Sequence, residues 1–300
     1  MTRPLSSAFT RALASDVPTR TLAEARARAA TFQAQVSTGR RVFRASDDPT
    51  AFAGARRLDA AEGRLDSYGE AVGAARFWAS RTADELDGMA ELMATANDLG
   101  VQGGNDTLDA TGRESVAARI DDLAEALIGR LNSKAEGEYL FGGHRTNQAP
   151  FDATGAPTTP SLAGDRRYRI GPDLDLAVNV DGDRVQTLSG GTSAVDALRA
   201  LAAAVRTGGA AATAALAPIA EGRDHFLALG AEAGSRLNRL DDADAQLEAS
   251  ALDLSRRRSD FQDADYYEAA TSLAQANLQL DATLQMLASD QQRTLLDYLR

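Results

Sequence analysis

The sequence predicts a mainly α-helical protein, an elongated antiparallel rod of coiled-coil-like helices that carries a small β-rich insert. Proline is the first guide, because it breaks the interior of a helix. None of the eight prolines lies between Pro49 and Pro150 or after Pro218, and four lie between 150 and 172. Apolar residues also recur at three- and four-residue spacing on both sides of this region, as in amphipathic helices. Within it they alternate with polar residues, as in strands.

Residues 1–45 are expected to form an N-terminal assembly helix and a connector. A helical stripe ends before Gly39. The arginine-rich run 40–44 and then Asp47, Asp48 and Pro49 follow. Two adjacent carboxylates are compatible with acid–base catalysis, but no histidine or second acidic cluster lies nearby in the sequence. Aspartate is a preferred N-cap and proline fits the first helical turn, so we interpret the segment as a helix start. The stripe consists of Leu22, Ala25, Ala29, Phe32 and Val36.

Residues 46–150 are expected to form rod helices. A long apolar stripe begins near Leu58 and is interrupted by the glycine-rich stretch 99–107. Thr111 and Glu114 have the spacing of a capping box, which predicts the start of a second helix. The connection between the two helices is short, so we expect them to be antiparallel neighbours.

Residues 151–191 are expected to form a small β insert. Apolar residues alternate with polar ones over 168–180, and Asp181-Gly182 is a hairpin-turn signal. We expect the insert to lie outside the assembly core, with both of its ends meeting at one tip of the rod. Replacing residues 153–189 with a Gly/Ser linker should then preserve the rod's helical content.

Residues 192–300 are expected to form a rod helix and a C-terminal assembly helix, with Ser193 as an N-cap and Asp196 at the third helical position. No Gly or Pro occurs from Ser235 to Arg300. Two apolar series in this stretch are offset near 261–266, as a stutter would produce. An unbroken helix here would be about 100 Å long. Such a helix must line a rod or a polymer.

The seam of this C-terminal helix has no assured partner within one chain. Isolated helices are marginally stable in water. We therefore expect the terminal segments to be disordered in the monomer and helical in the polymer. The seam residues are Leu273, Leu280, Leu284 and Leu287.

Composition excludes several classes of function. The net charge is −11, which argues against nucleic-acid binding. The chain has no cysteine, so disulfides, thiolate zinc sites and cysteine nucleophiles are excluded. No signal-peptide core and no run of about 18 apolar residues is present, so we expect neither a cleaved signal peptide nor membrane insertion.

No catalytic, cofactor or metal site is predicted, and the chain is not expected to be an enzyme. His144 and His225, the only histidines, lie far apart in the sequence. The run Phe141–Arg145 lacks the Gly-Lys-Ser/Thr ending of a phosphate loop and is interpreted as a turn. The run Asp263–Tyr267 does not have the spacing of an EF-hand and is expected on the outer face of the long helix.

Four stretches, taken in order, resemble the bacterial flagellin superfamily. They are "QVSTGRRVFRASDDPTAFAGARRL", "ANDLGVQGGNDTLDATGRESVAARIDDL", "GSRLNRLDDADAQL" and "FQDADYYEAATSLAQANLQLDATLQMLASDQQRTLLDYL". The resemblance covers roughly residues 20–150 and 192–300 and leaves the insert unmatched. Within the superfamily, "LNSKAEGEYLFGGHRTNQAPF" and the ending "TLLDYLR" are most similar to hook–filament junction proteins (hook-associated protein type 3). Filament flagellin remains the alternative.

The resemblance implies a structural subunit of the bacterial flagellum that assembles by packing its terminal helices. It implies a homo-oligomeric ring, neighbouring flagellar subunits (another hook-associated protein and flagellin), the flagellar export apparatus and a chaperone as partners. It also implies an extracellular location reached without a cleaved signal peptide. Asp47 and Asp48 would start the rod helix, and the run 40–44 would be a folded-back connector whose charges pair with a neighbouring subunit. A cytoplasmic coiled-coil scaffold shares the helical stripes, and a hydrolase using the two aspartates and the histidines is a third possibility.

Overall fold

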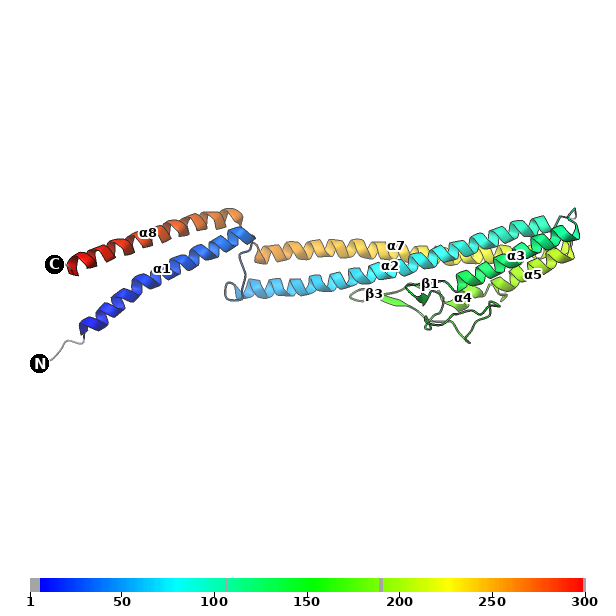
Figure 1. Cartoon of the computed structure of the whole chain (residues 1–300), viewed down its shortest axis with the longest axis horizontal. Helices are drawn as coiled ribbons and strands as arrows, with labels where there is room; N and C mark the ends of the chain where they lie inside the picture. Colours follow the sequence, from blue (N-terminus) through cyan, green and yellow to red (C-terminus); the bar gives the residue numbers. More distant parts are fainter. Residues whose placement is uncertain (1–5, 106, 189–190, 299–300) are drawn as a thin grey trace. The chain divides into compact units, whose positions relative to one another are not determined.

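The computed structural model describes residues 6–105, 107–188 and 191–298, and it divides the chain into two compact units. Unit 1 comprises Met1–Gly63 and Ala251–Arg300, and unit 2 comprises Arg64–Ser250. Figure 1 shows the helices and strands of both units. The predicted mainly α-helical fold with a small β-rich region is confirmed.

Unit 1 is built on two paired helices. They are α1 (Ser6–Thr38) and α8 (Tyr266–Tyr298), which lie against each other. The unit also includes the first turns of α2 (Pro49–Gly103) and the last turns of α7 (Leu216–Gln262). The remainder of α2 and α7 belongs to unit 2.

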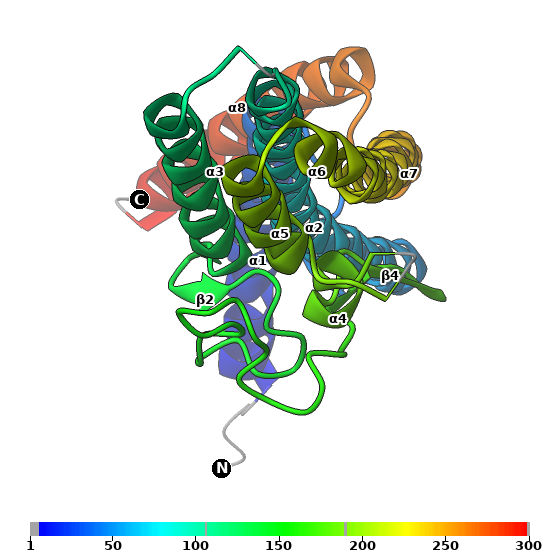
Figure 2. The ribbon, with the colours of Figure 1, turned by 90° about the vertical axis from the view of Figure 1, so that its right-hand side faces the viewer.

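Unit 2 is a bundle of helices that lie side by side lengthwise. Figure 2 looks along this bundle. Its members besides α2 and α7 are α3 (Ala110–Leu131), α4 (Gly182–Gln186), α5 (Ala194–Thr207) and α6 (Gly209–Ala214). Ion pairs tie α2 to α7, because Arg76 lies 2.7 Å from Asp241 and 3.2 Å from Asp244.

Small residues let the helices of unit 2 approach closely. A Cβ on Gly100 would lie 2.6 Å from the Leu216 side chain, and one on Gly103 would lie 2.6 Å from Val205. The first rod helix ends at Gly103, within the glycine-rich stretch 99–107 that was expected to interrupt it. Gly100 lies inside α2.

Two predictions from the sequence, the start of α3 and the turn at Asp181-Gly182, were wrong. The cap of α3 is Asp109, whose carboxylate accepts the Gly112 N–H at 2.7 Å, so Thr111 lies inside the helix. Asp181 does not form a hairpin turn but caps the short helix α4, accepting the Arg184 N–H at 2.9 Å. In both cases an aspartate side chain captures a free amide of the first turn. Ser193 caps α5 as predicted.

The β-rich region, which lies between α3 and α5, contains two small antiparallel hairpins. Strands β1 (Lys134–Ala135) and β2 (Glu138–Tyr139) form the first. Strands β3 (Arg167–Gly171) and β4 (Leu174–Ala177) form the second, with Tyr168 opposite Leu176. The tight turn of the second hairpin is at 172–173, nine residues before the Asp181-Gly182 pair that predicted it.

This region shares one hydrophobic core with the helices of unit 2. Phe151, Leu162, Ile170 and Val178 are buried in the same cluster as residues of α2, α3, α5 and α7. The Arg166 guanidinium lies 3.8 Å from the ring centroid of the α2 tryptophan, Trp78. The segment joins the end of α3 to the start of α5 and lies along the flank of unit 2, away from the α2–α3 turn (Figure 1). It does not lie at the tip, where we expected it.

The helices of this structure carry no membrane-crossing segment within the described ranges: none is both long and apolar enough.

Candidate assembly site in unit 1

The connector between α1 and α2 folds back along the end of α7. Gly39 ends α1 with a positive φ of 70°, a conformation that glycine adopts without strain. The Arg41 N–H donates to the Gln262 carbonyl at 2.7 Å, and the Ala264 N–H donates to the Gly39 carbonyl at 2.8 Å. Val42 is buried beneath this short antiparallel pairing. The run 40–44 is therefore anchored to the far end of the sequence.

Asp47 and Asp48 each serve a different part of the connector. One Asp47 oxygen accepts the N–H groups of Phe43 and Arg44 at 3.0 and 2.9 Å, which closes the turn. Asp48 accepts the Ala51 N–H at 2.9 Å and is the N-cap of α2. These amide hydrogen bonds stabilise the ionised carboxylates and lower the pKa of both side chains. The structure thus gives the two carboxylates local partners, as expected for a helix start.

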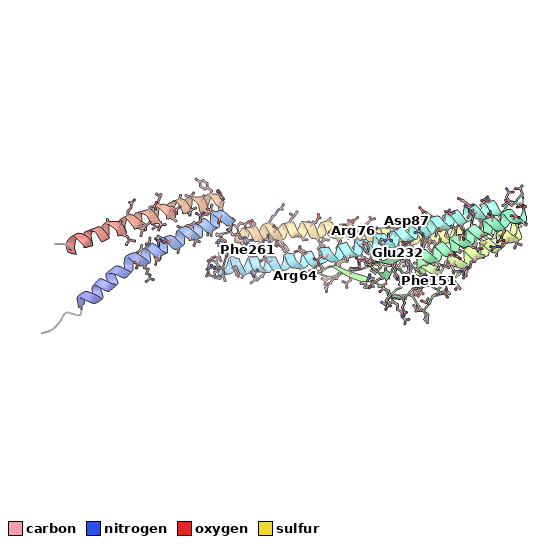
Figure 3. The ribbon with its side chains drawn as sticks, viewed as in Figure 1. Arg64, Arg76, Asp87, Phe151, Glu232 and Phe261 are labelled. Carbon is pink, nitrogen blue, oxygen red and sulfur yellow. The ribbon has the colours of Figure 1, made fainter. Side chains whose placement is uncertain are left out.

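Side chains tie the end of α7 to the start of α2. The Arg41 guanidinium donates to the Phe261 carbonyl at 3.3 Å and lies 3.4 Å from Asp48. The Phe261 ring, labelled in Figure 3, lies at the end of α7. It packs against Gly54, where an added Cβ would come within 3.1 Å of it. Arg258 of α7 pairs with Glu62 of α2. The joint is therefore held by packing and by charge.

The long C-terminal helix is interrupted at 263–265, although no glycine or proline is present. Asp265 caps α8 by accepting the N–H groups of Tyr267 and Glu268 at 2.8 and 3.1 Å. Asp263 accepts a hydrogen bond from Ser259. Aspartate side chains compete with the helix for backbone amides. The predicted stutter is therefore a helix break, and Asp263–Tyr267 marks it rather than the outer face of one helix.

The terminal helices have an intrachain partner, contrary to expectation. Small residues line their seam: Ala25 of α1 and Ala269 and Ala276 of α8 are buried. At the same three- and four-residue spacing, the predicted α8 residues Leu273, Leu280 and Leu287 are half-buried. Leu284, the fourth predicted residue, continues this spacing at the edge of the seam and is 40% exposed. The predicted α1 stripe included Ala25, but the predicted α8 seam missed Ala269 and Ala276, because short side chains carry a weak apolar signal.

On its other faces α8 exposes large apolar side chains among mostly uncharged polar ones. Leu278 is 70% exposed and Met286 is 73% exposed. At 100° per residue, Leu278 lies opposite the seam formed by Ala276 and Leu280. Between Tyr266 and Ser289 the only charged residues are Glu268 and Asp281. The sequence analysis did not single out Leu278 or Met286, although the scarcity of charge around the whole helix was a usable signal.

No catalytic arrangement joins the residues considered for one. Asp47 and Asp48 are in unit 1, while His144 and His225 are in unit 2, where His225 hydrogen-bonds the Arg184 carbonyl at 2.8 Å. Over the described parts of the chain, no cluster of three or more histidines and carboxylates is close enough to hold a metal ion. Unit 1 instead exposes large apolar side chains of α8, such as Leu278 and Met286, that can pack against other helices.

The model of the bacterial flagellin N-terminal helical region matches residues 12–146, and that of the C-terminal helical region matches 219–299. A curated relative, flagellar hook-associated protein 3 of Salmonella typhimurium, is 36% identical over 123 residues, or 40% of this chain and 39% of the relative. The Escherichia coli protein of the same name is 25% identical over 273 residues, or 83% of this chain and 86% of the relative.

A solved structure, the putative flagellar hook-associated protein from Vibrio parahaemolyticus, has a similar fold. Its TM-score is 0.67 at 21% identity, over 72% of this chain and all of that chain. At this level of identity the similarity shows that the two chains share a fold. The two family models together match more than two-thirds of the sequence, in the order and at the ends expected. The chain belongs to the bacterial flagellin family.

Proposed function

We propose that this chain is a structural subunit of the bacterial flagellum that forms the junction between hook and filament. The observation that carries the proposal is the exposed apolar surface of α8. Large apolar side chains that are exposed together on one element mark a surface for packing against another protein. In one chain α1 covers only the seam, and helices of neighbouring subunits would cover Leu278 and Met286.

The energy available from such packing is substantial. Burying a leucine or methionine side chain is worth about 1.5–3 kcal/mol. In the single chain Leu278 and Met286 gain little of this burial energy, since each is about 70% exposed. Most of it is therefore available for packing against a neighbouring subunit. A homo-oligomeric ring, in which α1 and α8 of neighbouring copies pack together, would recover it at every copy.

The choice of the junction rests on the relatives. Both curated relatives are named flagellar hook-associated protein 3. The motif Gly137–Gly143, with Tyr139 and Phe141, supports the same assignment. Filament flagellin is the second candidate, because both matching family models are described as flagellin regions. In either role the chain would be a structural protein and not an enzyme.

The same proposal assigns roles along the chain. Residues 1–45 and the C-terminal part of 192–300 would form the assembly helices and connector, 46–150 the rod, and 151–191 a β-rich insert. Asp47 and Asp48 would position the connector for contacts between subunits. The seam leucines Leu273, Leu280 and Leu287 would set the α1–α8 pairing, and Leu284 would face a neighbouring subunit.

The partners would be further copies of the chain, another hook-associated protein, flagellin, the export apparatus and a chaperone. The location would be extracellular, reached without a cleaved signal peptide. Immunogold labelling of sheared flagella tests the position. A junction subunit labels one end of each filament, a filament subunit labels the whole length, and absence of label would reject both.

A pair of substitutions tests the role of α8. Leu278→Glu should abolish incorporation into flagella while leaving the fold intact, because it places a charge on an open apolar face. Gln275→Glu adds the same charge at an exposed polar position of α8 and should be tolerated. Equal incorporation of the two variants would contradict the proposal.

A helix-breaking change tests the pairing itself. Leu280→Pro should cost roughly 3 kcal/mol or more in α8, because proline removes a helix hydrogen bond and clashes with the preceding turn. Unit 2 does not contain α8, so its unfolding should not change. Wild-type incorporation of this variant would count against assembly through α8.

A further inference from the structure

The two units of the chain differ sharply in charge. Unit 2 has 17 basic and 29 acidic residues, whereas unit 1 has 15 basic and 14 acidic residues. The acidic character of the protein is thus confined to unit 2. Within unit 1, the segment from Arg40 to Arg57 has five arginines and two aspartates.

Part of this positive charge surrounds an aromatic side chain at the surface. Phe43 lines two adjoining grooves of about 290 and 370 Å³. The first groove is lined by three arginines, Arg40, Arg56 and Arg258, and by Asp59, and the second is lined by Arg44 and Asp47. Among the described residues, Arg40 and Arg44 are exposed and form no salt bridge, and the nearby charge of Arg44 contributes to lowering the pKa of Asp47. We call Arg40, Phe43 and Arg44 the connector surface.

A complementary surface lies on α2 in unit 2. Asp87, Glu91 and Asp98 are exposed and, in the described part of the chain, form no ion pairs. At 100° per residue, their spacing of four and seven places them on one face of the helix. Figure 3 labels Asp87 on α2. Val101, which is 58% exposed, falls on the same face. We call these four residues the acidic row.

We propose that the connector surface of one copy binds the acidic row of a second copy of this chain. The proposal rests on the proposed function, since it specifies one contact of the assembly. The exposed guanidinium groups of Arg40 and Arg44 would meet two or three carboxylates of the acidic row, and Phe43 would meet Val101. A second copy is the occupant because the same chain supplies a surface of opposite charge and matching apolar content.

Like charges facing each other across an interface are strongly unfavourable, whereas exchanged charges are not. The test therefore reverses each surface, in a strain of the source bacterium that lacks its own copy. One variant carries Arg40→Glu and Arg44→Glu, and another carries Glu91→Arg and Asp98→Arg. The readout is the amount of chain in purified flagella, relative to the amount secreted into the medium.

Each reversal alone should reduce incorporation by about tenfold or more at unchanged secretion. Co-expression of the two variants should restore it, because each surface then meets its opposite on the other chain. The chain that carries both reversals should also assemble. A matched control, Arg119→Glu with Arg239→Glu, makes the same charge change at exposed, unpaired arginines of unit 2 and should incorporate normally.

The outcomes separate this inference from the proposed function. Normal incorporation of either single reversal would overturn the inference. Loss of incorporation without rescue by co-expression would also overturn it, because the two surfaces would then have other partners, while the flagellar role would stand. Absence of the wild-type chain from purified flagella would instead reject the proposed function.

Discussion

Phe151→Ala tests whether the β-rich region is an integral part of unit 2. The Phe151 ring is only 2% exposed, inside the core shared with α2, α3, α5 and α7. Its backbone is fixed on both sides by Asn132 at the end of α3, which accepts its N–H at 3.1 Å and donates to its carbonyl at 3.0 Å. Because the main chain is held, the cavity left by the ring cannot readily collapse. We expect a loss of about 3–5 kcal/mol in the free energy of unfolding.

The assay is urea unfolding followed by the fluorescence of Trp78 and by helical circular dichroism. Trp78 is the only tryptophan, is buried in α2, and has the Arg166 guanidinium against its ring. A loss of this size should lower the midpoint by about 1–3 M urea. Leu174→Ala, at a residue of β4 that is 52% exposed, is the control and should change stability by less than about 0.5 kcal/mol.

A midpoint for Phe151→Ala within about 0.3 M of the wild type would refute the reasoning, since it would mean that the helices do not depend on this region. The same packing changes the result expected from replacing residues 153–189 with a Gly/Ser linker. Removing those residues takes Leu162, Ile170 and Val178 out of the core. We now expect that replacement to lower the stability of unit 2 rather than to leave its helices unaffected.

Three further changes probe separate features. Gly143→Ala should cost about 2–5 kcal/mol by urea unfolding, because it combines a left-handed backbone with a Cβ only 2.2 Å from a carbonyl oxygen. Gly137→Ala, equally left-handed but with nothing near its Cβ, should cost only about 1–2 kcal/mol, and equal losses would contradict the steric argument. Arg166→Ala should change the tryptophan fluorescence and cost about 1–2 kcal/mol through lost cation–π contact, and an unchanged spectrum would deny that contact. Asp48→Asn should speed amide exchange at Ala51 at neutral pH. In the wild type, the hydrogen bond from the Ala51 N–H lowers the folded pKa of Asp48 below 3.8. The stabilisation of the folded state by this cap is therefore complete above about pH 4. It is lost only as the pH falls through the lower folded pKa. Loss of protection already at pH 5 would argue against the cap.

The long helices were predictable because their signals are local and repeated. The stripe Leu22 to Val36, the stop at Gly39 and the start at Pro49 all agree with α1 and α2. Ser193 was found as a cap from its spacing to Asp196, although the same spacing between Thr111 and Glu114 placed the start of α3 two residues too late. Each of these depends on residues within one or two turns of one another.

The features that were missed depend on contacts between distant segments. The break at 263–265 has no glycine or proline, and the connector that pairs with it is more than 200 residues away in the sequence. The alanines that α8 contributes to the α1–α8 seam, Ala269 and Ala276, become recognisable only when they are found buried. The β-rich region looked separable because its proline and glycine content resembles a loop, whereas its burial is determined by α2 and α3.

The break at 263–265 and the apolar surface of α8 are connected physically. If α7 and α8 formed one straight helix, the Gln262 carbonyl would bond within it and would not be free for the Arg41 N–H. The break instead gives the connector a partner, and Asp265 satisfies the first amides of α8 without a neighbouring subunit. α8 can therefore begin as a capped helix within one chain while Leu278 and Met286 remain open. The same residues that end α7 thus start α8 as a separate helix, on which Leu278 and Met286 are exposed.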